Sequence, residues 1–142
     1  MPRVLGLDHG DKRIGVAVSD PMEMIASPVA ILDAAQGGGL PEIERICREK
    51  EIGKIVVGLP LNMNGTAGPQ AEKVREFVKQ LQARLPAIPV TTWDERLTSR
   101  AGERVLIEAG TSRKRRREVL DKMAAQIMLQ GYLDAHGPTE TF

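Results

Sequence analysis

Aromatic residues are scarce in this chain of 142 residues, where Phe, Trp and Tyr together make up 3%. Domains that bind single-stranded RNA by stacking its bases need exposed aromatic rings, so the composition argues against that class of protein. Cysteine is scarcer still. Because Cys47 is alone, an internal disulfide is excluded, and two histidines cannot complete a Cys and His zinc cluster with it. This cysteine usage is typical of a reducing compartment.

Long apolar runs are also missing. No stretch of about 18 apolar residues occurs, so we expect no transmembrane segment. The opening apolar run is broken by Asp8 and is too short for a secretory signal, which makes the cytoplasm the expected location. A strong charge of one sign is absent as well, because 20 Lys and Arg face 19 Asp and Glu. The total charge of +1 therefore predicts no polyanionic partner.

The hydrophobic residues, 42% of the chain, suffice for one core. Residues 1–137 are predicted to form a single domain, followed by a frayed tail at 138–142. Alternating and β-branched patterns predict strands, and patterns of period 3.6 predict helices. The strands are expected at 3–8, 13–19, 27–32, 54–59 and 90–93, and the helices at 40–53, 69–85, 98–110 and 118–135. Three strands in a meander, followed by βα units, indicate an α/β domain with a mixed five-stranded sheet flanked by helices.

Three acidic residues stand out by their positions. Asp8 closes an apolar strand, Glu95 follows the strand at 90–93, and Asp121 lies in the first turns of the last predicted helix. Ligands of α/β sheets bind at the carboxyl ends of the strands. Asp121 precedes Ala124 and Ala125 by three and four residues, so these three residues lie on the same side of the predicted helix. Because alanine side chains are small, that side of the helix can pack closely against the sheet.

Three neighbouring carboxylates repel one another, and a hard divalent cation such as Mg²⁺ or Mn²⁺ relieves the repulsion. Two such ions are a known device for in-line displacement at phosphorus, so the implied reaction is phosphodiester hydrolysis. Each acid also has an ordinary structural interpretation. Asp8 suits a turn, Glu95 suits a surface pair with Arg96 or Arg100, and Asp121 suits a helix N-terminus. Spacing alone does not show that the three converge.

Four blocks of sequence together resemble the YqgF/RuvX family. They are GLDHGDKRIGVAVSD at 6–20, VVGLPLNMNGTAGPQA at 56–71, DERLTS at 94–99 and DKMAA at 121–125. The blocks stand in the family's order and cover nearly the whole chain. The resemblance implies an RNase H-like fold, a role in pre-16S rRNA processing and a relationship to Holliday junction resolvases. It also places the family's acidic positions on Asp8, Glu95 and Asp121.

Basic residues supply the expected contacts to nucleic acid. By the resemblance, Lys12 and Arg13 match the family's basic pair after the first turn, where they could hold a phosphate or simply be solvated. Between residues 96 and 122 there are nine Lys or Arg against four Asp or Glu. The peak is a predicted basic loop, interpreted as an arm for the phosphate backbone or as a solvated loop. It comprises Arg113, Lys114, Arg115, Arg116 and Arg117.

Two other positions have more than one interpretation. His9 is expected to neighbour the site and not to act as a general base. The loop at 62–68 combines glycines with short polar side chains ahead of a helix, so it could offer backbone amides to a phosphate or be a plain connection.

The leading hypothesis is a metal-dependent nuclease that cleaves pre-rRNA with the help of Mg²⁺ or Mn²⁺. The chemistry favours two ions. Branched DNA is the alternative substrate, and resolving a four-way junction would favour a homodimer. A second hypothesis is a nucleotide-binding phosphotransferase, because the actin and sugar-kinase superfamily also begins with a strand that carries D-x-G. The length of the chain disfavours it, since those enzymes close two domains around ATP. A third hypothesis is a non-catalytic ribosome-assembly or nucleic-acid-binding factor on the same scaffold.

Overall fold

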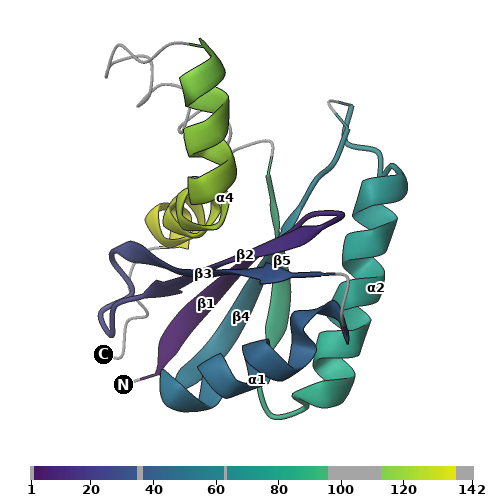
Figure 1. Cartoon of the computed structure of the whole chain (residues 1–142). Coiled ribbons are helices and arrows are strands. Elements are labelled where there is room, and N and C mark those ends of the chain that lie inside the picture. Colours follow the sequence, from purple (N-terminus) through teal and green to yellow (C-terminus); the bar gives the residue numbers. More distant parts are fainter. Residues whose placement is uncertain (1, 35–36, 63, 96–112, 137–142) are drawn as a thin grey trace.

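Five strands form one mixed sheet in the order β3-β2-β1-β4-β5 (Figure 1). The computed structural model describes residues 2–34, 37–62, 64–95 and 113–136, and for residues 113–122 it describes the backbone. The three N-terminal strands pair antiparallel, and β1, β4 and β5 pair parallel. The predicted α/β fold, a meander joined to two parallel strands, is confirmed. The strands are β1 (Arg3–His9), β2 (Arg13–Ser19), β3 (Ala26–Asp33), β4 (Ile52–Leu59) and β5 (Val90–Asp94).

Helices cover both faces of the sheet. A short 3-10 turn, η1 (Gly37–Gly39), leads into α1 (Leu40–Glu49), which lies with α2 (Pro69–Arg84) on one face, while α4 (Arg113–His136) crosses the other (Figure 1). The core under α1 and α2 is built largely of β-branched and leucine side chains. The second core, between the sheet and α4, includes Val4, Val56, Ala125, Leu129 and Tyr132. Two apolar layers of this kind hold the sheet between helices.

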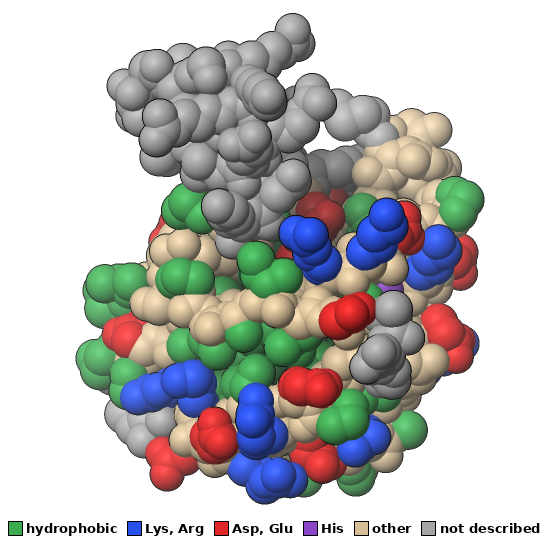
Figure 2. Space-filling view, in the orientation of Figure 1, with side chains coloured by type: hydrophobic (Ala, Val, Ile, Leu, Met, Phe, Trp, Pro, Cys, Tyr) green, Lys and Arg blue, Asp and Glu red, His purple; other side chains and the backbone are tan. Residues whose placement is uncertain are grey.

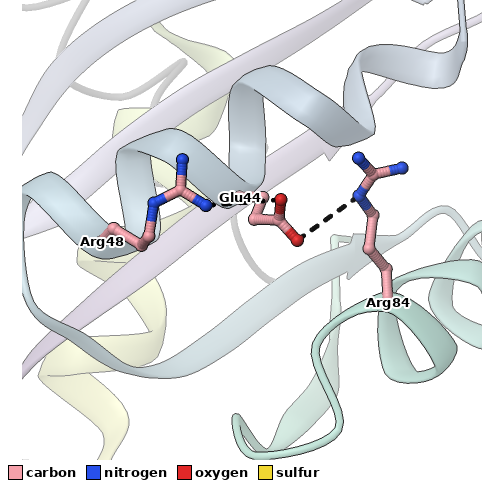
Figure 3. Close-up of polar contacts among 3 residues, drawn as sticks. All are labelled: Glu44, Arg48 and Arg84. Carbon is pink, nitrogen blue, oxygen red and sulfur yellow. Dashed lines mark hydrogen bonds and ion pairs between the residues drawn. The ribbon is translucent and has the colours of Figure 1, made fainter.

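Ion pairs on the surface tie α1 to α2. Glu44 lies between Arg48, one turn along α1, and Arg84 at the end of α2 (Figure 3). The N–O distances are 3.4 and 3.6 Å. Because these side chains are substantially exposed, each pair contributes at most about 1 kcal/mol to stability. The buried apolar contacts of the two helices therefore matter more for their position.

The predicted end of the first helix at Gly53 is wrong. The helix ends at Glu49, and Glu51 takes a left-handed φ of 55° in the turn that follows. Ile52 then pairs with Arg3, so Gly53 lies inside β4. A glycine is the residue that most often follows the end of a helix, whereas here a non-glycine residue makes the turn.

The predicted basic loop at 113–117 is also wrong, since this segment forms the first turns of α4. Arg and Lys are good helix formers, so a run of them is compatible with a helix when nothing breaks it. On α4 the buried residues are Ala125, Met128, Leu129, Tyr132 and Leu133, whereas Ala124 and Ile127 are half-buried. The predicted helix at 98–110 and the tail at 138–142 lie outside the described residues.

Among the described residues, the structure contains no helix that is both long enough and apolar enough to cross a membrane.

Candidate active site

Asp8 lies on the face of the sheet that α4 covers, between two glycines on the neighbouring strands. In β2 its partner is Gly15, and in β4 the residue after the Leu7–Val57 pair is Gly58. Gly15 faces α4, because a Cβ added there would come within 3.2 Å of the Ala125 Cβ. Side chains alternate between the faces of a strand, so Asp8 and these glycines form one row across the sheet.

Glu95 directly follows β5 and reaches this row from the other side. Its backbone N–H donates a hydrogen bond to the carbonyl oxygen of Leu59, at the end of β4, with an N–O distance of 3.1 Å. Its side chain is hydrogen-bonded to the carboxylate of Asp8. The structure thus brings together two of the three predicted acidic residues, one in β1 and one directly after β5.

Glu95 binds its proton more tightly than an exposed glutamate does. Burial, above all, raises the pKa of Glu95 to about 9, and the hydrogen bond to Asp8 and the negative charges of Asp8 and Asp94 add to the shift. Asp8 and Glu95 are both half-buried. A divalent cation can take the place of the proton in such a pair, because the cation neutralises both carboxylates.

Asp121 lies in α4, the helix that covers this face of the sheet. Ala125 packs over Gly15, at the level of Asp8, and Asp121 is one helical turn before Ala125 on the same side of α4. The side chain of Asp121 lies outside the described residues. Among the side chains that the structure does describe, no three His, Cys, Asp or Glu residues form a metal-binding group.

The other basic and polar candidates lie around the turn between β1 and β2. Lys12 and Arg13 are exposed there, and Arg13 pairs in register with Asp33 of β3. Asp11 forms an exposed ion pair with Lys73 of α2, with an N–O distance of 3.0 Å. An open pocket of about 540 Å³ is lined by Asp11, Lys12, Arg13, Ile31, Leu32 and Asp33. Figure 2 shows Lys and Arg side chains at the upper right of the described surface and along its lower part, with acidic side chains near them.

His9 is directed away from Asp8, to the opposite face of the sheet. Its ring packs against Phe77 of α2, with 4.4 Å between the ring centroids. Its Nδ1 is buried without a hydrogen-bond partner among the described residues, and burial lowers the pKa of the ring. His9 therefore packs beneath the site, on the α2 side of β1.

The loop before α2 is held by hydrogen bonds within itself. The Asn62 N–H donates to the carbonyl of Thr66 at 2.9 Å, and the Asn62 side-chain amide donates to the Thr66 hydroxyl at 3.0 Å. That hydroxyl donates in turn to Asn64, and Gly65 takes a φ of 86°. The loop is thus a turn with a defined conformation, joined by a bridge between Leu61 and Ala67.

Sequence reasoning missed the two glycines that flank Asp8. A glycine inside a strand often marks a close approach of another group, and both Gly15 and Gly58 carry that signal. The signal was available in the sequence, but it does not say which group approaches.

Comparison with known proteins extends these observations over nearly the whole chain. The RuvX family model, described as "Holliday junction resolvase", matches residues 2–135. The chain belongs to the RuvX family. A RuvX relative from Syntrophomonas wolfei, named "Putative pre-16S rRNA nuclease", is 53% identical over 136 residues and covers 93% of this chain and 94% of its own. A relative with the same name from Listeria monocytogenes is 47% identical, covering 93% and 97%.

The RuvX fold also resembles solved structures of RuvC from Thermus thermophilus. The structure of that protein in complex with a Holliday junction substrate superposes with a TM-score of 0.57, covering 96% of this chain and 97% of RuvC. A second RuvC structure gives a TM-score of 0.52. At 14% identity these matches establish a shared fold, which confirms the predicted RNase H-like architecture.

Proposed function

We propose that this chain is a metal-dependent nuclease that hydrolyses phosphodiester bonds in the precursor of 16S rRNA, in the cytoplasm. The observation that carries the proposal is the half-buried, hydrogen-bonded pair of carboxyl groups, Asp8 and Glu95, at the edge of the sheet where the parallel strands end. Close relatives that cover nearly the whole chain are named as pre-16S rRNA nucleases, which supports this choice of substrate.

Asp8, Glu95 and Asp121 would hold Mg²⁺ or Mn²⁺. Their oxygen atoms suit hard cations, and the pKa of Glu95 is raised by its burial first and by the neighbouring Asp8 carboxyl group second. When bound, two such ions would neutralise charge that develops on the phosphate and favour attack by water. Asp121 is included because its helical position lies one turn from Ala125, which packs beside Asp8.

The protein's own groups have separate tasks in this proposal. The Asp8 and Glu95 pair gives up its proton when cations bind. Lys12 and Arg13, exposed after β1, would hold the phosphate backbone next to the reacting group. The basic first turns of α4, residues 113–117, would bind more distant phosphates and would not read bases.

Holliday junction cleavage is a second candidate, favoured by the description of the matching family. It predicts a pair of symmetric cuts and therefore a homodimer on the junction. A third candidate, a binding factor without catalysis, predicts that no substrate is cut.

The test is a cleavage panel with purified protein, with and without Mn²⁺ or Mg²⁺. The substrates are RNA carrying the 5′ extension of 16S rRNA, an unrelated single-stranded RNA, duplex RNA and a four-way DNA junction, with Asp8→Asn as the matched inactive control. We expect metal-dependent cutting of the 16S precursor. Preferred cutting of the junction would favour the second candidate, and no cutting of any substrate by wild type would favour the third.

A further inference from the structure

Gly58 lies in β4 directly beneath the carboxyl group of Glu95. A Cβ built on Gly58 would be 2.9 Å from both Cγ and Cδ of Glu95, closer than real Cβ atoms approach other heavy atoms. Its nearest neighbours are all atoms of the Glu95 side chain. The φ of Gly58 is not in the left-handed region, so the backbone itself would accept alanine. Glycine is required at position 58 because the Glu95 side chain occupies the space that a Cβ would fill.

The strand order explains why Glu95 needs that space. Asp8 lies in β1 and Glu95 follows β5, with β4 between them. Neighbouring strands are about 4.8 Å apart, so the Glu95 side chain must extend across β4 to reach Asp8. The backbone of Glu95 is already fixed by its hydrogen bond to Leu59, which leaves only the side chain to cover the distance. Any side chain at position 58 would stand in its path.

The other glycines on this face serve a different purpose. A Cβ on Gly6 would meet Leu129, and one on Gly15 would meet Ala125, so both of these glycines accommodate apolar residues of α4. Gly58 accommodates a carboxyl group instead. A purely structural role, like that of Gly6 and Gly15, would involve packing against the helix.

We propose that Gly58 is a positioning residue for the metal site, which acts by leaving open the path along which Glu95 reaches Asp8. The inference rests on the proposed function for the metal, but the contact between Gly58 and Glu95 can be tested without it. Replacement of Gly58 by alanine should displace the Glu95 carboxyl group and leave Asp8 without its partner, while β4 remains paired on both sides.

The first measurement is a double-mutant cycle on the metal-free protein, with thermal unfolding of wild type, Gly58→Ala, Glu95→Ala and the double variant. We expect Gly58→Ala to lower the melting temperature in the wild type and to have little effect when Glu95 is already alanine. Gly6→Ala, where the added Cβ would meet only Leu129, is the matched control, and its effect should be the same with either residue at position 95. Equal effects of Gly58→Ala in both backgrounds would overturn the proposal. If Gly58→Ala alone does not fold, the double variant should fold, and its failure to do so would also overturn it.

The second measurement is Mn²⁺ binding by calorimetry. Gly58→Ala should bind Mn²⁺ at least about tenfold more weakly than wild type, comparable to the removal of a group that supports a metal ligand. Wild-type affinity in a folded Gly58→Ala protein would contradict the inference while leaving the nuclease proposal intact. If wild type itself neither binds Mn²⁺ nor cuts RNA, the proposed function fails, and the unfolding cycle still decides whether Gly58 positions Glu95.

Discussion

The carboxyl groups of Asp8 and Glu95 share a hydrogen bond across β4, although Asp8 lies in β1 and Glu95 directly follows β5. The bond depends on a proton, since two ionised carboxylates would repel each other at this separation. Proton binding and metal binding therefore compete for the same pair of groups. The metal affinity and the stability of the protein should both depend on that competition.

The affinity for Mn²⁺ should increase with pH between about 7 and 9. Because the pKa of Glu95 is raised to about 9, the cation must displace a proton throughout this range, and displacement becomes easier as the proton concentration falls. Calorimetry in two buffers with different heats of ionisation would count the protons released. We expect close to one proton per binding event at pH 7. Affinity that does not vary with pH, with no proton release, would contradict the competition.

The metal-free protein should lose stability over the same pH range. Glu95 has a folded-state pKa of about 9 and a reference value of 4.5, so the folded state holds the proton more tightly. The contribution of such a group is fully present below pH 4.5 and declines as pH rises toward 9. Thermal melts of wild type and Glu95→Gln from about pH 7 to 9 would isolate this effect, because the variant lacks the titrating group. The melting temperature of the wild type should fall more steeply with pH than that of Glu95→Gln. Parallel curves for the two proteins would contradict the raised pKa of Glu95.

Replacement of the acidic residues should separate catalysis from folding. We expect Asp8→Asn, Glu95→Gln and Asp121→Asn each to reduce cleavage by at least about 100-fold, the upper end of what removal of groups around a metal costs. Circular dichroism should show an intact fold. In the metal-free protein Glu95→Gln should melt at or above the wild-type temperature at about pH 8, since it removes a group that is disfavoured when charged. Wild-type rates in any two of the three variants would refute the triad.

The sequence predicted the five strands because strands of this kind leave strong local signals. The continuous apolar run in β4 follows from burial on two faces. In β2 the branched residues Ile14, Val16 and Val18 alternate with small residues that face α4. The prediction missed the helical first turns of α4. A run of five basic residues suggests a solvated loop because of its charge, but Arg and Lys also favour helices. The pairing of Asp8 with Glu95 could not be predicted from spacing, because it depends on which strand lies between them and on the absence of a side chain at Gly58.

The basic run at 113–117 should contribute to substrate binding and not to the chemical step. Replacement of Arg113, Lys114, Arg115, Arg116 and Arg117 by Gln keeps residues that favour a helix, so α4 should still form, while the cations that would bind phosphate are removed. We expect weaker binding to all RNA sequences alike, and nearly unchanged turnover at saturating substrate.

The dependence of binding on salt provides the quantitative test of this phosphate binding. The slope of log K against log salt concentration should become shallower by roughly 0.7 to 0.9 for each phosphate that the variant no longer neutralises. Arg45→Gln with Lys79→Gln is the control, because both residues are exposed on α1 and α2, across the sheet from α4. An unchanged slope in the 113–117 variant would show that the run does not touch phosphate. Loss of turnover at saturation would instead place one of these cations in contact with the reacting phosphate, since only transition-state contacts alter that rate.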